Sequence, residues 1–198
     1  MKIPKGSFGY LKNQRMKYLT NIIVFLSISI LIFLIGFITS DYDNGNYFTI
    51  VAILLFLPTA LWIVRYIIFA KYKGPDKAKY LILEAAIKEK AHTGILVDLL
   101  LTNNKGIQYL PFVVVNENRL LVYTNDKQLA NLDKNALDKS LKNTENYLKN
   151  IYKPKGIELN VNAYGDLEML IKEVKTFKET ETTQIHNDVI YQLLLHCM

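Results

Sequence analysis

Two apolar segments near the start of the chain decide the fold: YLTNIIVFLSISILIFLIGFIT (18–39) and FTIVAILLFLPTALWIVRYIIFA (48–70). Each is long enough to cross the hydrocarbon core of a bilayer as an α-helix, which takes about 20 residues. The polar stretch SDYDNGNY (40–47) is a short connection between them. The sequence therefore predicts a transmembrane hairpin, followed by an α/β domain over 71–198.

Positive charge lies on both flanks of this hairpin. Residues 1–17 contain five basic side chains and no acidic one, and residues 71–79 contain four lysines against one aspartate. Because basic residues mark the cytoplasmic side, we expect a multi-pass protein of a bacterial-type cell membrane, with residues 1–17 and 71–198 in the cytoplasm and 40–47 outside. The residues expected at the inner membrane interface are Lys12, Arg15, Lys17, Arg65, Lys71 and Lys73.

The distribution of charge also indicates the partner. The formal net charge is +6, but the chain beyond residue 91 is nearly neutral. A lipid bilayer with an anionic inner leaflet is therefore favoured over nucleic acid, which is not expected as a partner. Arg65 lies six residues before Lys71, so its guanidinium reaches the cytoplasmic headgroups by snorkelling.

The domain over 71–198 reads as alternating helical and extended segments. Amphipathic or helix-favouring patterns occupy 76–91, 133–152, 165–175 and 185–197, and short runs rich in Leu, β-branched and aromatic residues occupy 93–104, 106–116, 119–124 and 155–164. In the first of these strands, strict alternation places Ile95, Val97 and Leu99 on one face and Leu96 and Leu100 on the other. A strand that is apolar on both faces predicts a mixed sheet with helices on both sides, in the order α-β-β-β-α-β-α-α.

Asp98 is the candidate for chemistry in this domain. It stands in the middle of a predicted strand, where burial of a carboxylate costs several kcal/mol unless it is paired. It is a candidate metal ligand or acid/base group, with Glu84 as its acidic companion. The alternatives are an Asp that points past an edge strand into water, or one paired with a lysine of a covering helix. Beyond these two residues we predict no catalytic residue, metal or cofactor.

The segment GILVDLLLTNNKGIQYLPFVVVNENRLLVYTNDK (94–127) resembles the sheet of the nuclease-related (NERD-type) domains, which have the restriction-endonuclease-like fold. The matching stretches are QYLPFVVV and VYTN. The resemblance implies that Leu110 stands in place of the family's metal-binding Asp, Tyr123 in place of its Glu and Asn125 in place of its Lys. It therefore implies a relative that lacks the family's catalytic residues.

The segment over 185–197 predicts an apolar helix that needs a cover. Ile185, Val189 and Leu193 form an apolar stripe along this helix. The stripe can be covered by the chain's own sheet, by a second copy or by the membrane. We expect association with a second copy or a protein partner. The only cysteine, Cys197, lies at the end of this helix, so no disulfide forms within the chain. It is a candidate for palmitoylation or an intermolecular bridge, or is the incidental end of a helix.

Three functions remain open from the sequence. The first is a membrane-anchored interaction module without catalysis. The second is a membrane-tethered, diverged nuclease-like hydrolase that uses Asp98 and Glu84. The third is an accessory subunit of a transport or secretion complex, with the hairpin as its contact surface.

Overall fold

The computed structural model describes residues 3–39, 45–88, 90, 93–103, 106–124, 134–177 and 184–198. The chain divides into two compact units, each described by itself below. One is a helical hairpin over Leu11–Lys73. The other is an α/β unit made of Met1–Tyr10 together with Gly74–Met198. The sequence predicts a separate basic segment over 1–17, whereas the structure packs residues 3–10 into the α/β unit.

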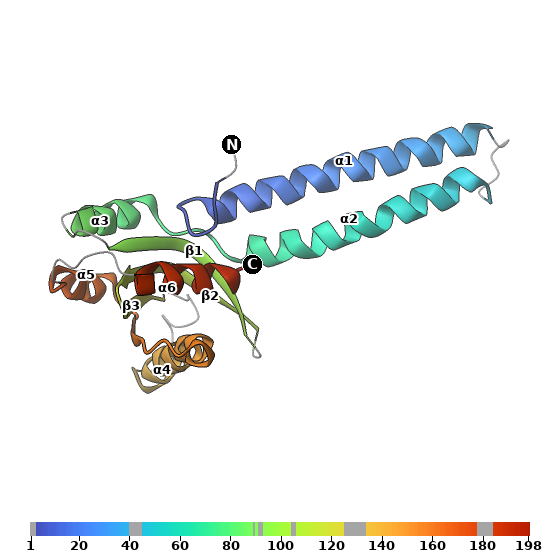
Figure 1. The fold of residues 1–198 in the computed structure, drawn as a ribbon. Helices are drawn as coiled ribbons and strands as arrows, with labels where there is room; N and C mark the ends of the chain where they lie inside the picture. The colour runs from blue at the N-terminus through green and yellow to red at the C-terminus, as the bar shows by residue number, and fades with distance from the viewer. Residues whose placement is uncertain are drawn as a thin grey trace. The chain divides into compact units, whose positions relative to one another are not determined.

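The hairpin consists of α1 (Tyr10–Thr39) and α2 (Tyr47–Lys71), which run side by side (Figure 1). Both are long enough and apolar enough to cross a membrane. Inside the hairpin, the Ser29 hydroxyl donates a hydrogen bond to the Ala52 carbonyl (2.7 Å), and Phe25 meets Trp62 edge-on with ring centroids 4.4 Å apart. Small and aromatic side chains therefore face the partner helix, while most of the large aliphatic side chains remain exposed.

Asn46 fixes the turn of the hairpin at the start of α2. Its Oδ1 accepts a hydrogen bond from the Thr49 amide (3.0 Å), which caps the helix, and its Nδ2 donates to the Gly36 carbonyl of α1 (3.0 Å). A Cβ on Gly36 would overlap the side chain of Phe48. Glycine at this position therefore allows the two helices to approach closely where the chain turns back.

The α/β unit is built on a four-stranded mixed sheet in the order β1-β2-β3-β4. The strands are β1 (Gly94–Asn103), β2 (Gly106–Asn116), β3 (Arg119–Tyr123) and β4 (Asn160–Tyr164). The first three form an antiparallel meander, and β4 pairs with β3 in parallel. The parallel pair requires a crossover, and α4 (Lys134–Tyr152) lies in that connection.

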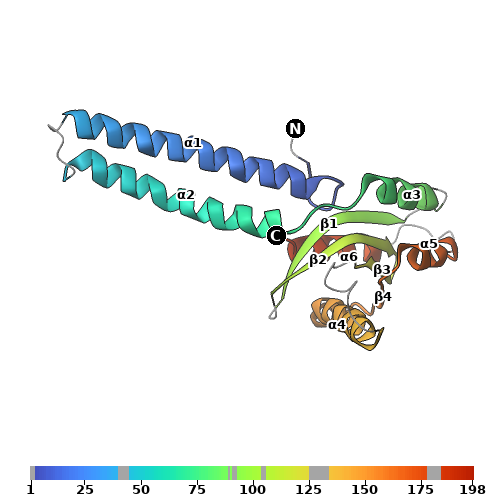
Figure 2. The ribbon, with the colours of Figure 1, turned by 180° about the vertical axis from the view of Figure 1, so that it is seen from behind.

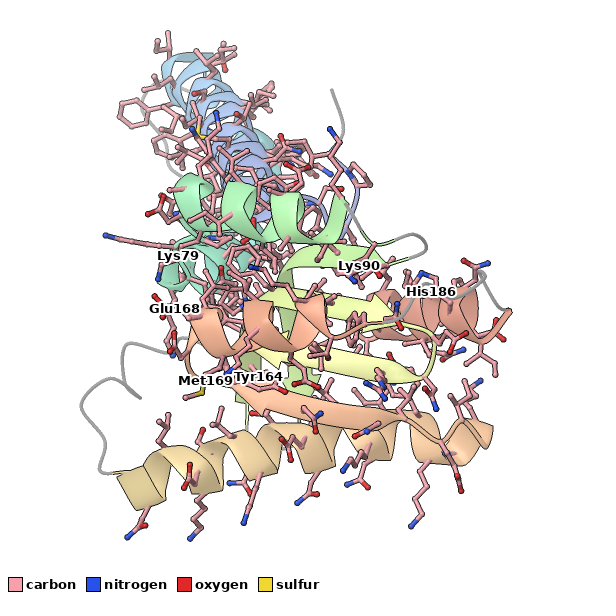
Figure 3. All side chains as sticks on the ribbon, turned by 90° about the vertical axis from the view of Figure 1, so that its left-hand side faces the viewer. Lys79, Lys90, Tyr164, Glu168, Met169 and His186 are labelled. Carbon is pink, nitrogen blue, oxygen red and sulfur yellow. The ribbon has the colours of Figure 1, made fainter. Side chains whose placement is uncertain are left out.

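Helices cover both faces of this sheet (Figure 2), which confirms the prediction of a mixed sheet packed between helices. On one face lie α3 (Lys77–Lys88) and α5 (Leu167–Lys175); on the other lie α4 and α6 (Gln184–Leu195). Figure 3 shows α3 and α5 side by side, with Lys79 and Glu168 at the same end of that layer. The sheet therefore has a hydrophobic core on each side.

Two boundaries differ from the sequence pattern by five residues or more. Helix α1 begins at Tyr10 rather than at residue 18, because its first two turns are polar and lie before the apolar segment. Strand β4 begins at Asn160 rather than at residue 155, because Lys153–Lys155 form a short 3-10 helix that ends at Gly156 in the left-handed conformation. Ile157 and Leu159 still pack against the core, which explains why their alternation resembles a strand.

Candidate functional site

Strands β1 and β2 share a break at Asp98 and Pro111. Asp98 has a φ of +60°, which is uncommon for a residue other than glycine, and Pro111 offers no amide hydrogen to the ladder. Val97 pairs with Phe112 before the break and Leu99 with Leu110 after it, so both strands change phase together and the register is kept. The break therefore reverses which side chains face each core without shifting the strand pairing.

This phase change corrects the expected alternation. Val97 lies in the core with α3 and α5, whereas Leu99 lies with Leu96 in the core with α4 and α6. The sequence places Val97 and Leu99 on one face because strict alternation assumes extended backbone throughout. A left-handed residue between them moves the later side chains to the opposite face.

The side chain of Asp98 is enclosed at this break. Only 1% of its surface is exposed, and its Oδ1 accepts a hydrogen bond from the Tyr109 hydroxyl (3.1 Å). Gly74 lies against the same carboxylate, since a Cβ on Gly74 would sit 3.4 and 3.5 Å from its two oxygens. The alternative of an Asp that points past the edge into water is therefore wrong. The carboxylate instead lies at the point where the chain joins the α/β unit after α2.

Glu84, the expected companion of Asp98, differs from it in exposure and in hydrogen-bond partner. It is exposed on α3 and accepts a hydrogen bond at Oε1 from the Tyr80 hydroxyl (2.8 Å). The pKa of Tyr80 is raised, mainly by burial and to a lesser extent by the hydrogen bond to Glu84. Within the described part of the chain, no group of three or more His, Cys, Asp or Glu side chains is placed to hold a metal ion.

Residues 3–10 form a segment that we call the N-terminal clasp. The Gly6 carbonyl accepts a hydrogen bond from the Val97 amide (2.7 Å), directly beside the break. Phe8 stacks on Tyr80 of α3 with ring centroids 4.8 Å apart. Lys5 donates from Nζ to the Cys197 carbonyl (2.8 Å), and the Tyr10 hydroxyl donates to the Met198 carbonyl (3.3 Å). The clasp thus joins β1, α3 and the residues that follow α6.

Residues 196–198, here called the C-terminal tail, cover the same edge of β1. The Met198 amide donates to the Leu100 carbonyl (3.0 Å), and Cys197 forms an isolated antiparallel bridge with Leu101. The Cys197 thiol is buried and donates to the Leu193 carbonyl (3.2 Å). Burial raises its pKa to about 12, despite the opposing effect of Lys5. These surroundings favour the incidental helix end over palmitoylation or an intermolecular bridge.

Helix α6 docks on the sheet of its own domain. Val189 and Leu193 are buried in the core with α4, and the Tyr152 hydroxyl donates to the Val189 carbonyl (2.8 Å). A Cβ on Gly94 would lie 3.1 Å from Cδ1 of Ile190, so glycine permits the close approach of the helix. The expected association stripe is therefore corrected: Val189 and Leu193 are covered from within the domain, and Ile185 alone is 48% exposed.

The residues expected at the membrane interface lie mainly on the surface of the hairpin. Five of them are exposed, namely Lys12, Lys17, Arg65, Lys71 and Lys73, and Arg15 is partly covered. The Lys71 ammonium lies over the ring of Tyr72, 5.6 Å from its centroid. Exposure of Arg65 on the helix surface is what snorkelling requires.

The positions singled out by the nuclease-like resemblance are separated in space. Leu110 is buried in the core beside α4 and α6, and Tyr123 in the core beside α3 and α5. The Lys79 ammonium lies over the Tyr123 ring, 5.9 Å from its centroid. Asn125 lies outside the described residues. The two described positions thus occupy opposite faces of the sheet.

Comparisons of this chain with protein-family models, with curated proteins and with solved structures found no match.

Proposed function

We propose that this chain is a two-pass protein of the cell membrane whose α/β domain faces the cytoplasm and serves as an interaction module. The observation that carries the membrane part is the surface of the hairpin. Large aliphatic side chains along both helices are exposed, for example Leu31 and Ile38 on α1 and Leu57 and Leu61 on α2. A water-soluble protein rarely exposes so extensive an apolar surface, whereas a bilayer covers it.

The α/β unit contains chain from both sides of the hairpin, which supports two membrane crossings. Residues 3–10 precede the hairpin and residues 74–198 follow it, yet they pack into one unit. If the helices cross a membrane, both flanking parts must lie on the same side of it, which requires an even number of crossings. The basic residues at 1–17 and 71–79 favour the cytoplasmic side.

Cysteine labelling of intact cells tests this topology. In a Cys197→Ala background, a membrane-impermeant maleimide is expected to label Tyr47→Cys, which lies at the tip of the hairpin, and to leave Lys149→Cys on α4 unlabelled. Both side chains are exposed in the structure, so burial does not account for a difference. Lysed cells, in which both positions react, are the control. Labelling of Lys149→Cys alone, or of both positions in intact cells, would contradict the proposed topology.

The outer face of α3 supports the interaction module. Leu81 and Ile82 are 50% and 56% exposed, and Ala78 and Ala85 extend the same face. The opposite face of the helix, with Leu83, is buried against the sheet. An apolar face on a helix that is already docked is typical of a contact surface.

The pattern on this face favours a second copy of the chain as the partner. A two-fold axis between Leu81 and Ile82 would pair two α3 helices antiparallel, with Leu81 against Ile82 and Ala78 against Ala85. Lys77 and Glu84 lie on one flank of the face, and the axis brings the same flanks together. Lys77 of one copy then lies within about 3 Å, along the helix axis, of Glu84 of the other. The proposed pairing thus places apolar residues against apolar residues and opposite charges near each other, as a self-complementary interface requires.

Disulfide cross-linking in the membrane tests this pairing. In the Cys197→Ala background, a copy carrying Ala78→Cys is expected to cross-link to a copy carrying Ala85→Cys. Ala78→Cys alone is the matched control. Two copies of it would place their cysteines about 10 Å apart along the axis, too far for a disulfide. Adding Leu81→Asp should abolish the cross-link, and Glu84→Lys should weaken it unless Lys77→Glu is also present. Equal cross-linking of the control would refute the antiparallel arrangement.

A further inference from the structure

The N-terminal clasp and the C-terminal tail protect an edge of the sheet that is otherwise open. Strand β1 pairs with β2 on one side only, so the backbone groups on its other side need partners. Val97 donates to Gly6 of the clasp before the break, and Leu100 accepts from Met198 of the tail after it. The change of phase at Asp98 explains why two separate segments are required, because the groups that face outward shift by one residue there.

The clasp is also the start of a hairpin helix. Tyr10 is the first residue of α1, and its hydroxyl donates to the Met198 carbonyl. Two residues before Phe8, Gly6 fits between β1 and α6 in the left-handed region, with a φ of +80°. A Cβ on Gly6 would lie 2.8 Å from Cδ2 of Leu96 and 3.1 Å from Cδ2 of Leu194. The fit of the clasp therefore depends on glycine at this position.

We infer that the clasp links the position of α1 to the C-terminal tail, so that withdrawal of the clasp releases the tail from the edge of β1 and exposes Cys197. The contacts that would be lost form a connected set. Lys5 donates a hydrogen bond to the Cys197 carbonyl, and the Tyr10 hydroxyl donates one to the Met198 carbonyl. The Gly6 carbonyl accepts a hydrogen bond from Val97 of β1. Because α1 continues directly from the clasp, a displacement of this helix pulls on all three. A displacement of α1 would thereby change the surface of the α/β domain at the edge of β1.

Cys197 is a built-in reporter of this release, since it is the chain's only cysteine and is 6% exposed. In the full-length protein, alkylation by N-ethylmaleimide at pH 7.5 is expected to be at least tenfold slower than in the denatured chain. Gly6→Val is expected to accelerate alkylation at least tenfold, because valine cannot fit between Leu96 and Leu194. Lys5→Ala, which removes the hydrogen bond to the Cys197 carbonyl and no apolar packing of the clasp, is expected to accelerate alkylation about threefold. Circular dichroism verifies that both variants remain folded.

Gly9→Val is the matched control. Gly9 has a φ of +84°, close to that of Gly6, but a Cβ there would meet only Cδ1 of Ile3, at 4.0 Å. It therefore reproduces the backbone strain without the clash, and alkylation should stay within twofold of the wild type. If Gly9→Val accelerates alkylation as much as Gly6→Val, or if neither Gly6→Val nor Lys5→Ala accelerates it, the clasp does not control the tail.

A second arm tests the link to α1 and rests on the membrane insertion proposed above. In phosphatidylcholine vesicles of short and long acyl chains, alkylation of wild-type Cys197 is expected to differ at least threefold. The same two bilayers should give equal rates for Gly6→Val, in which the link is already broken. Equal wild-type rates would overturn the coupling. The labelling test of topology uses a Cys197→Ala background, so a failure of insertion is recognised separately.

Discussion

Asp98→Val is expected to lower the free energy of unfolding by about 2–4 kcal/mol. A β-branched residue in the left-handed region is strained by about 1–3 kcal/mol, and the Tyr109 hydroxyl loses its acceptor, which costs about 1 kcal/mol more. Gly74 lies against the Asp98 carboxylate, and the hydrogen bond between Val97 and Gly6 lies next to it. The substitution therefore also disturbs the packing of Gly74, which follows α2, and of Gly6, which precedes α1. Denaturant unfolding of the full-length protein in detergent, followed by circular dichroism, measures the loss.

Two other substitutions at Asp98 separate backbone from side chain. Asn tolerates the left-handed conformation and retains an acceptor for Tyr109, so Asp98→Asn should cost no more than about 1 kcal/mol. Gly relieves the strain but removes the acceptor, so Asp98→Gly should fall between Asn and Val. If valine is tolerated as well as asparagine, neither the conformation nor the hydrogen bond at this break matters for stability.

Gly36→Val is expected to disrupt the hairpin where α1 and α2 turn back on each other. The added side chain overlaps Phe48, and its Cβ would lie 2.9 Å from Oδ1 of Asn46, which both caps α2 and bonds to α1. Overpacking of this kind costs about 1–3 kcal/mol, and the loss of the Asn46 contacts adds to it. Titration with SDS, followed by the fluorescence of Trp62, the only tryptophan, should show unfolding at a lower SDS fraction.

Ser27→Val is the control for this experiment. Ser27 is exposed on α1, so the same side chain is added to the same helix without meeting α2. Its SDS midpoint should equal that of the wild type. An equal shift for Ser27→Val and Gly36→Val would mean that valine weakens α1 itself, and that the close approach at Gly36 contributes little.

The sequence predicts those parts of the fold that depend on local pattern. Long periodic or continuous patterns occupy the two apolar segments, the helix over 133–152 and the strand over 106–116. Each becomes a helix or strand at nearly the expected bounds, except that α1 begins eight residues before the first apolar segment. Periodicity of this kind reports burial directly, because it repeats with the geometry of the element. The mixed sheet between two helical layers follows from the apolar character of both faces of β1.

The features that escape the sequence are local exceptions to those patterns. Nothing in a run of apolar residues shows that Asp98 is left-handed or that Pro111 lies opposite it, although an Asp and a Pro within predicted strands are both signals of irregular backbone. The clasp could not be predicted because its partners lie far away in the sequence. Its composition gives one hint, since KGSFGY combines two glycines with two aromatic residues in a segment that charge alone assigns to the membrane surface.

The bond between Lys5 and Cys197 joins residues separated by 192 positions. At a synthesis rate of about 5–20 residues per second, Lys5 is added to the chain roughly 10–40 s before Cys197. Through that interval the clasp has no tail to contact, and Val97, the partner of Gly6, is synthesised only about halfway through it. If α1 inserts into the bilayer during this time, it keeps the clasp at one surface and limits the volume it must search. Completion of the domain is then a late event, and insertion of the hairpin prepares it.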